Sequence, residues 1–334
     1  MTTKSSIKMP PVTIIGSGAL GSLFAAYLEP HSDVRMLSHW PEQISAIHSD
    51  SLICQNIDGQ RTRHEFVVTN NVRELAPVRL AIVLVKSYQT ARAAFELAPV
   101  LAADGVAITL QNGLGNYEIL QKALGYGRVA QGITAQGATM LGPGRVRHAG
   151  YGPTFIARLP GKERLLGDMV DLLNRAGLKA ESSSDVTSLQ WGKLAVNAGI
   201  NPLTAILGVR NGRLLQDERT NRVMCAAALE VELVAQSLGT TLPYEDVAIR
   251  VQEVAHATAD NVSSMLQDVR RGSETEIDAI NGAVVSYGKQ TGLATPVNFA
   301  LWRVVKEGGS ALPADDAGRE RLLGELLDAI DEAE

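Results

Sequence analysis

Residues 12–28 contain the feature that most restricts how this chain can fold, a short aliphatic segment followed by a glycine-rich turn and an apolar helical segment. Val12-Thr13-Ile14-Ile15 is typical of a short buried strand, and the pattern after the turn predicts a helix that ends near Leu28. The turn between them reads Gly16-Ser17-Gly18-Ala19-Leu20-Gly21. A strand that leads into a helix through such a turn is the beginning of a parallel βαβ unit.

The spacing of the three glycines predicts a dinucleotide-binding turn. Gly16 permits the tight turn, Gly18 lets the backbone approach a pyrophosphate, and Gly21 lets helix and strand pack closely. The beginning of the helix adds free N–H groups and the positive end of the helix dipole. Because glycine is frequent in this chain, at 31 residues, a glycine-rich turn without a ligand is the alternative. The flanking strand and helix favour the site, whose predicted cofactor-binding residues are Gly16, Gly18, Ala19, Leu20 and Gly21.

Further aliphatic runs alternate with helical patterns in the first half of the chain. Residues 33–37, 80–85 and 105–110 read as strands. From residue 186 onward nearly everything reads as helix, and the polar residues 181–185 read as a linker and helix start. Helix stops are expected at Asn201-Pro202, Asn211-Gly212, Gly239 to Pro243 and Gly292 to Pro296. The predicted fold class is therefore α/β. We expect an N-terminal Rossmann-like doubly wound sheet domain at residues 1–180 and an all-α C-terminal domain at residues 181–334.

Length and composition agree with two globular domains and exclude several classes of protein. At 334 residues, 45% hydrophobic and 20% charged, the chain can bury a large core and is not disordered as a whole. A net charge of −5 gives no overall field to attract nucleic acid. No apolar run approaches the roughly 20 residues that span a bilayer, and the N-terminus has no secretory apolar region. Cys54 and Cys225 are expected to be reduced thiols, no metal-ligand spacing is found, and we expect a cytoplasmic protein.

Polar side chains follow several of the expected strands, where the ligands of an open α/β sheet lie. Residues 35–40 at the end of the second strand contain no carboxylate to bind the ribose diol of NAD. This argues against NAD and favours NADP, whose additional phosphate would take donors such as Ser38 and His39. Lys86 and Asn112 follow two later strands. The alternatives are an ordinary surface imidazole, a solvated lysine and a turn-forming asparagine.

In the helical half, Lys193, Asn197 and Asn201 stand at i, i+4 and i+8 and therefore stack along one helix face. Asparagine costs stability inside a helix relative to alanine, so these two amides need partners. A solvated polar face is the alternative, although such faces favour Glu, Lys and Arg over Asn.

Two further polar groups lie nearer the C-terminus. Asn261 and Ser264 are expected one helical turn apart. Glu274 and Glu276 precede an expected helix start, and composition alone assigns both to helix capping.

Taken together, these motifs resemble the ketopantoate reductase (2-dehydropantoate 2-reductase) family, from Gly16 to about Lys306. Several ordered motifs with matching spacing are more specific than any one of them. They are the GxGxxG turn, Lys86, Gln111-Asn112-Gly113-Leu114-Gly115, Pro143-Gly144-x-Val146 with His148, Lys193-Leu194-Ala195-x-Asn197-x-x-x-Asn201-Pro202-Leu203-Thr204-Ala205, Ser263-Ser264-Met265-Leu266-Gln267-Asp268 and Thr275-Glu276-Ile277-Asp278-x-x-Asn281-Gly282.

The resemblance implies NADPH-dependent reduction of ketopantoate to pantoate, a step toward pantothenate and coenzyme A. It implies that Lys193 is the catalytic lysine, acting as general acid, and Glu276 the catalytic glutamate. Lys86 matches a lysine near the nicotinamide, and Asn112 and Glu276 also belong to the implied cofactor-binding set. The implied substrate-binding residues are Asn112, Lys193, Asn197, Asn201, Asn261 and Ser264.

One departure from the family pattern concerns the cofactor. Relatives commonly carry an arginine for the 2′-phosphate after the second strand, where this chain has His39. Two other functions stay open: a related NAD(P)-dependent reductase or dehydrogenase of another 2-oxo acid, and a dinucleotide-sensing protein without catalysis. The expected partner is a small 2-oxo acid, with neither nucleic acid nor membrane, and a homodimer is left open.

Overall fold

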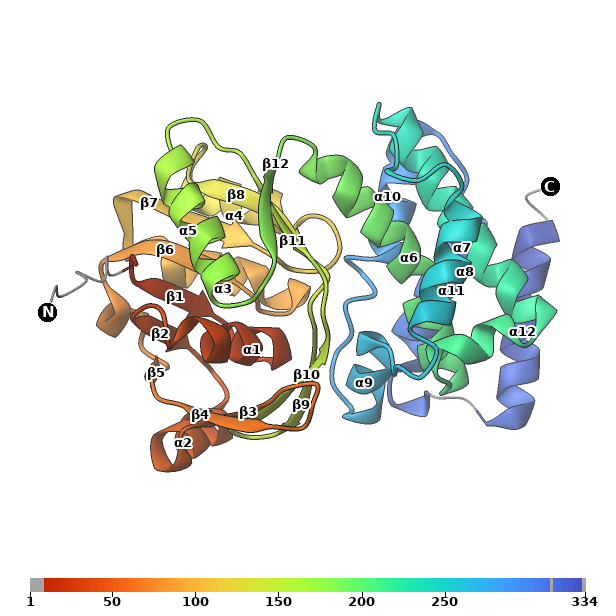
Figure 1. The fold of residues 1–334 in the computed structure, drawn as a ribbon. Helices are drawn as coiled ribbons and strands as arrows, with labels where there is room; N and C mark the ends of the chain where they lie inside the picture. The colour runs from red at the N-terminus through yellow and green to blue at the C-terminus, as the bar shows by residue number, and fades with distance from the viewer. Residues whose placement is uncertain (1–8, 313–314, 332–334) are drawn as a thin grey trace, which may run out of the picture. The chain divides into compact units, whose positions relative to one another are not determined.

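The computed structural model describes residues 9–312 and 315–331. These residues form two compact units (Figure 1). The first contains the described residues of Met1–Gln111 and Asn116–Val186. The second contains Asn112–Gly115 and the described residues of Thr187–Glu334. The short segment Asn112–Gly115 thus belongs to the helical unit, although it directly follows a strand of the first one.

The first unit is built on an eight-stranded sheet with the order β12-β11-β8-β7-β6-β1-β2-β5. Six neighbouring strands, from β8 to β5, run parallel, while β11 pairs with β8 antiparallel and with β12 parallel. The strands are β1 (Val12–Ile15), β2 (Val34–Leu37), β5 (Val67–Thr69), β6 (Val78–Val83), β7 (Leu101–Thr109), β8 (Val129–Thr134), β11 (Thr154–Ala157) and β12 (Ala180–Ser183). This confirms the predicted α/β fold class with its doubly wound sheet.

Helices cover both faces of this sheet, which explains why its central strands are apolar throughout. Ile14 of β1 lies in a buried core with Phe24 and Met169, whereas its neighbour Ile15 lies in a second core with Leu97. Phe24 comes from α1, Met169 from α5 and Leu97 from α3. The helices of this unit are α1 (Ala19–Leu28), α2 (Pro41–Asp50), α3 (Thr90–Leu97), α4 (Asn116–Leu124) and α5 (Glu163–Arg175), with the short 3₁₀ turns η1 (Val72–Leu75) and η2 (Ser87–Gln89).

A second, four-stranded sheet in the same unit has the order β4-β3-β10-β9. Its strands are β3 (Leu52–Gln55), β4 (Arg61–His64), β9 (Gly137–Gly142) and β10 (Arg145–Gly150). Buried His148 of β10 ties this sheet to α1, because the hydroxyl of Tyr27 lies 2.7 Å from its Nδ1. Its Nε2 lies 2.9 Å from Oε1 of Gln136. Burial lowers the pKa of His148, which keeps this imidazole in its neutral form.

The prediction of a linker at residues 181–185 is wrong for residues 181–183, whereas the predicted helix start is confirmed, because a helix begins at Val186. Ala180–Ser183 is strand β12, which pairs in parallel with β11 at the edge of the large sheet. Its two central side chains, Glu181 and Ser182, are exposed. An edge strand pairs through its backbone and can keep polar side chains in solvent, so its composition resembles that of a linker.

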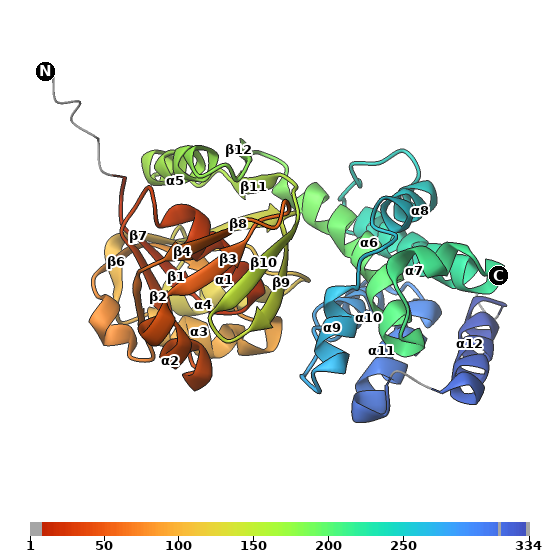
Figure 2. The same ribbon diagram turned by 60° about the horizontal axis from the view of Figure 1, so that its bottom comes forward.

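The second unit is helical, and Figure 2 shows its helices from a second side. Its elements are α6 (Val186–Leu207), η3 (Asn211–Leu215), α7 (Glu218–Ser237), α8 (Val247–Ala257), α9 (Ser264–Arg270), α10 (Asn281–Thr291), α11 (Pro296–Gly308), η4 (Gly309–Ala311) and α12 (Asp316–Asp331). One continuous core unites them: it includes Leu203 of α6, Val231 of α7, Leu301 of α11 and Leu326 of α12.

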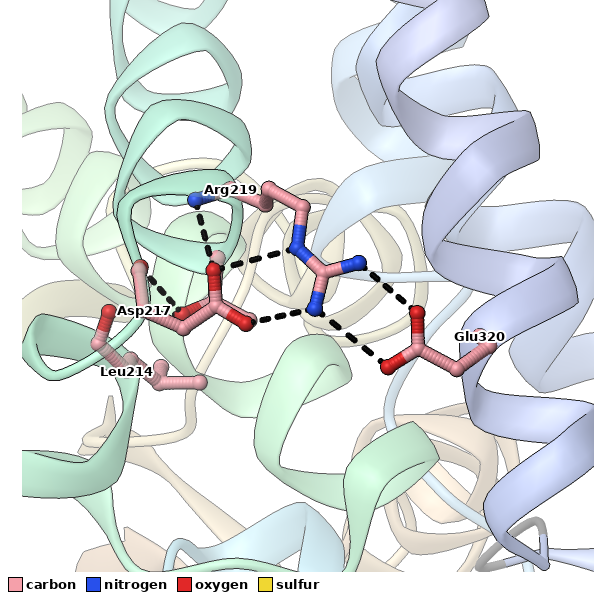
Figure 3. Close-up of polar contacts among 5 residues, drawn as sticks. Leu214, Asp217, Arg219 and Glu320 are labelled. Carbon is pink, nitrogen blue, oxygen red and sulfur yellow. Dashed lines mark hydrogen bonds and ion pairs between the residues drawn. The ribbon is translucent and has the colours of Figure 1, made fainter.

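Helix α12 is joined to the start of α7 by a forked ion pair (Figure 3). Arg219 donates from Nη1 to Oε2 of Glu320 over 2.7 Å and from Nη2 to Oδ2 of Asp217 over 2.8 Å. Asp217 also caps α7, because its Oδ1 accepts a hydrogen bond from the backbone N–H of Arg219. The guanidinium thus holds the carboxylates of two helices with the same planar group.

The expected helix stop at Asn201-Pro202 is also wrong, since α6 continues through Pro202 to Leu207. A proline inside a helix leaves the carbonyl four residues earlier without its helical partner. Here that carbonyl belongs to Ala198, and it accepts a hydrogen bond from the side chain of Asn281 instead.

Candidate active site

The glycine turn of the first unit has the close packing that its sequence predicted. Gly16 has a φ of +109°, and a Cβ there would lie 2.8 Å from the backbone nitrogen of Val85. A Cβ on Gly21 would lie 2.0 Å from the carbonyl oxygen of Gly16. Both positions therefore exclude any side chain for reasons internal to the protein.

Gly18 is different from the other two glycines of the motif. Its φ of −65° suits any residue, and a Cβ there would have no described atom within 4 Å. Gly18 is also the N-cap of α1 and supplies no side chain to the N–H groups of that helix, among them those of Ala19 and Leu20. The protein itself does not require glycine at this position, but a phosphate that approaches the helix N-terminus does. The turn thus fits the pyrophosphate of a dinucleotide.

The end of β2 has polar groups whose partners were not visible in the sequence. Ser38 is buried, and its Oγ lies 2.5 Å from Oγ of Ser17 in the glycine turn. His39 is exposed, and its Nε2 lies 2.9 Å from Oε2 of Glu96 on α3. Nε of Arg92 donates to the other oxygen of this carboxylate over 3.1 Å. A carboxylate thus does reach this strand end, from a residue 57 positions further along the chain.

Lys86 lies just beyond β6, as expected. It precedes η2, and its carbonyl oxygen accepts a hydrogen bond of 2.8 Å from the backbone N–H of Gln89. The predicted cofactor-binding residues from Gly16 to Lys86 thus all lie in the first unit, at or beyond the carboxyl ends of β1, β2 and β6.

In the second unit, Asn112 lies between Lys193 and Glu276. Nζ of Lys193 donates to Oδ1 of Asn112 over 2.8 Å. Nδ2 of Asn112 in turn donates to Oε2 of Glu276 over 3.4 Å. The ammonium can only donate and the carboxylate only accept, so these two partners determine the orientation of the amide. The structure brings together the two residues that the family resemblance named as catalytic.

The segment that carries Asn112 is held by three contacts within the second unit. The backbone N–H of Leu114 donates to the carbonyl of Ala279 over 2.8 Å. The carbonyl of Gly113 accepts from Nε2 of Gln190 over 3.0 Å. Gly113 has a φ of +80°, and a Cβ there would lie 2.4 Å from the oxygen of Ala279. Gln190 lies on α6 with Lys193, so the same helix positions both the lysine and its amide partner.

The surroundings of Lys193 change its acidity. Burial lowers the pKa of its ammonium from 10.5 to about 8, while the negative charge of Glu276 acts in the opposite direction and raises it. A group with a pKa near the working pH is suited to general acid–base catalysis, because it can both give up and regain a proton.

The other predicted substrate-binding residues lie on two helices and in one loop of the second unit. Asn197 and Asn201 follow Lys193 by one and two turns of α6, and Asn201 is buried. The prediction that Asn261 and Ser264 share one helix is wrong: Asn261 is an exposed loop residue, and Ser264 is the first residue of α9. The chain leaves the helical conformation there because Ser263 caps α9, its Oγ accepting from the N–H of Leu266.

The capping role that composition assigned to Glu274 and Glu276 is wrong as well. Helix α10 begins at Asn281 with Ile280 as its N-cap, and its first turn holds no acidic residue. The carbonyl of Glu276 accepts the N–H groups of Ala279 and Ile280, which makes residues 276–280 a turn of their own. This turn keeps Glu276 buried, at 6% exposed, with its carboxylate hydrogen-bonded to Asn112.

The described residues contain no group of three or more His, Cys, Asp or Glu that could hold a metal ion. Among the same residues, no helix is long and apolar enough to cross a membrane. Cys54 and Cys225 are both free thiols, and burial raises the pKa of each, to about 11 for Cys54.

Comparison with known proteins decides the family. The model described as "Ketopantoate reductase PanE/ApbA" matches residues 12–161, and the model of its C-terminal part matches residues 185–308. The chain belongs to the ketopantoate reductase family. It is thus a member of a family of oxidoreductases with a Rossmann-like fold, as the sequence motifs indicated.

Individual relatives agree over most of their length. A 2-dehydropantoate 2-reductase of Archaeoglobus fulgidus is 37% identical over 303 residues, which cover 90% of this chain and 98% of that protein. The crystal structure of a ketopantoate reductase family protein from Ralstonia eutropha matches with a TM-score of 0.82 at 27% identity, covering 93% of this chain and 99% of that one. The structure of D-mandelate dehydrogenase with NADH and anilino(oxo)acetate matches with a TM-score of 0.84 at 26% identity and the same coverage.

Proposed function

We propose that this member of the ketopantoate reductase family reduces 2-dehydropantoate to pantoate with NADPH, in the cytoplasm, on the way to pantothenate and coenzyme A. In this proposal residues 1–180 bind the dinucleotide, and residues 181–334, together with Asn112, supply the catalytic and substrate-binding groups. The observation that carries it is the hydrogen-bonded series Lys193–Asn112–Glu276, which holds an ammonium with a pKa of about 8. Relatives named 2-dehydropantoate 2-reductase, up to 37% identical, support the choice of substrate.

Reduction of the ketone to an alcohol requires a proton donor at the ketone oxygen. A bound nicotinamide cofactor supplies the hydride. As negative charge develops on the oxygen, Nζ of Lys193 stabilises it and then transfers a proton to it, so the ammonium becomes an amine and the product an alcohol. A lysine pKa of about 8 makes this transfer easier than from an exposed lysine, while most of the lysine stays protonated at pH 7.

Asn112 and Glu276 prepare Lys193 for this step. Asn112 accepts a hydrogen bond from one of the three ammonium N–H groups and so fixes the position of Nζ. Glu276 raises the pKa of the lysine through its charge, which favours proton uptake after each turnover. We assign Asn197, Asn201, Asn261 and Ser264 to the carboxylate and hydroxyl of the substrate, for which amides and hydroxyls are suitable partners.

For the cofactor, we propose NADPH with the 2′-phosphate near His39 and Ser38. The absence of a carboxylate in residues 35–40 supports this choice. Glu96 supports the other choice, because its carboxylate adjoins His39 and could accept hydrogen bonds from a ribose diol. The similar D-mandelate dehydrogenase is described with NADH, so an NADH-dependent reductase of another 2-oxo acid is the second candidate.

The test is a spectrophotometric assay of the purified protein. Oxidation of NADPH and of NADH is followed with 2-dehydropantoate and with a panel of other 2-oxo acids. The proposal expects the highest kcat/KM for 2-dehydropantoate with NADPH. Higher values with another 2-oxo acid or with NADH would establish the second candidate. Cofactor binding without turnover of any 2-oxo acid would indicate a dinucleotide-sensing protein instead.

A further inference from the structure

Pro202 leaves a gap in the hydrogen bonds of α6, next to the residues assigned to the substrate. Because proline has no N–H, the carbonyl of Ala198 loses its helical donor. Ala198 is fully buried, so solvent is kept from replacing the donor. A buried carbonyl without a hydrogen-bond donor destabilises the folded state. It lies between Asn197 and Asn201, on the helical turn that carries both.

The side chain of Asn281 fills this gap from the start of α10. Its Nδ2 donates to the oxygen of Ala198 over 3.1 Å and to Oδ1 of Asn298 over 2.9 Å. Asn281 is fully buried, and its own Oδ1 has no hydrogen-bond partner among the described residues. The hydrogen bonds of the Asn281 side chain are therefore the two that its nitrogen donates.

Asn298 and Glu230 determine the direction of this donation. Nδ2 of Asn298 donates to the carbonyl of Ala227 over 2.9 Å and to Oε2 of Glu230 over 2.7 Å, which leaves its Oδ1 as the acceptor for Asn281. Glu230 is itself fixed at the N-terminus of α11, accepting the backbone N–H groups of Val297 and Asn298 over 2.8 Å each. Burial raises the pKa of Glu230, and these hydrogen bonds oppose the rise.

Asn281 also adjoins the turn that holds the catalytic glutamate. That turn spans residues 276–280 and ends at the N-cap of α10, directly before Asn281. One buried amide therefore connects the middle of α6 with the end of the Glu276 turn. Movement of this amide would change the position of Lys193 relative to Glu276, and it would free α6 to bend at Pro202.

We propose that Asn281 is a positioning residue for the reaction assigned above: it replaces the helical hydrogen bond that Pro202 removes and thereby keeps Lys193, Asn197 and Asn201 in register on α6. Asn298 and Glu230 orient Asn281 for this task. The inference rests on the proposed function for its kinetic readout, but the coupling between Asn281 and Pro202 is a property of the helix itself.

A double-mutant cycle tests this proposal. Asn281→Ala is compared in the native background and in Pro202→Ala, where alanine restores the N–H that bonds to Ala198. In the native background we expect kcat/KM for 2-dehydropantoate to fall by about 10- to 100-fold, as a catalytic group displaced by about 1 Å does, with the Kd for NADPH unchanged. In the Pro202→Ala background the loss should be at least several-fold smaller. Gln290→Ala, an exposed change on the same helix as Asn281, is the matched control and should leave both kcat/KM and the Kd for NADPH unchanged.

Equal losses in both backgrounds would overturn the proposal, since Asn281 would then act only as a core residue. If Asn281→Ala does not fold, Asn281→Asp, which has the same shape but no N–H₂, takes its place. If either single variant fails to fold and Pro202→Ala restores folding, the rescue supports the proposal; failure of both double variants overturns it. If the native protein does not turn over 2-dehydropantoate, the proposed function fails, and the cycle is then measured as the difference in thermal unfolding.

Discussion

Lys193 and Asn112 lie 81 positions apart in the sequence and are joined by a hydrogen bond of 2.8 Å from ammonium to amide oxygen. The same amide donates to Glu276, so one asparagine connects the proposed proton donor with the carboxylate whose charge raises its pKa. All three residues belong to one compact unit, and the glycine motif belongs to the other.

The pH dependence of turnover should report Lys193. The ammonium must be protonated to donate, so kcat/KM for 2-dehydropantoate should be level below pH 8 and fall as the pH rises through about 8. Because the charge of Glu276 raises this pKa, Glu276→Gln should lower it and move the falling limb to lower pH. Rate measurements from pH 6 to 10 check both statements. A limb that stays in place or moves to higher pH in the variant would contradict the assignment.

Gly18 should prove necessary for the cofactor and not for the fold. An added Cβ meets no described atom within 4 Å, so Gly18→Ala should leave the Tm unchanged or slightly higher. The same Cβ would obstruct the pyrophosphate and should weaken NADPH binding about tenfold or more, which is about 1.4 kcal/mol. Fluorescence titration and thermal unfolding measure the two effects.

Two other glycine variants serve as controls for Gly18. Gly167→Ala on α5 also meets no described atom, so it should stabilise the protein by about 0.5–1 kcal/mol and leave NADPH binding alone. Gly21→Ala should destabilise the fold, because its Cβ would lie 2.0 Å from the oxygen of Gly16. A Gly18→Ala variant that binds NADPH normally would remove Gly18 from the cofactor site.

The end of β2 should determine which dinucleotide is preferred. His39→Arg adds a permanent charge and a forked donor, so the Kd for NADPH should fall by about tenfold, while that for NADH stays constant. Glu96→Gln removes the carboxylate 2.9 Å from His39 and should also favour NADPH. Calorimetric titration with both cofactors measures this preference. If Glu96→Gln loses affinity for NADH and does not gain affinity for NADPH, Glu96 instead binds the ribose diol of NADH.

Local patterns were sufficient for most elements of the fold but not for the partners of their side chains. The glycine turn, the buried strands and the i, i+4, i+8 spacing on α6 follow from short-range periodicity, which the sequence displays directly. Glu276 lies 164 positions from Asn112, and composition alone assigned it to a helix cap. Glu96 lies 57 positions from His39, and no local pattern indicated this pair. The family resemblance, not periodicity, pointed to Glu276.

Two errors of the sequence analysis have the same physical cause. Strand β12 is polar because an edge strand is held by its backbone, and α6 passes through Pro202 because a distant asparagine supplies the missing donor. In both cases a tertiary hydrogen bond outweighs a local preference. In the sequence, the helical pattern continues on both sides of Pro202. This was the one visible signal that a donor from elsewhere completes the helix.

The most direct test of the account is the turnover of 2-dehydropantoate by Lys193→Met, measured together with its Kd for NADPH. If Lys193 is the proton donor, kcat should fall by about 10²- to 10⁴-fold, the loss expected for a general acid, while the Kd for NADPH stays unchanged. Lys289→Met, an exposed lysine on α10, should keep the native kcat. A Lys193→Met enzyme with native kcat would contradict the central claim.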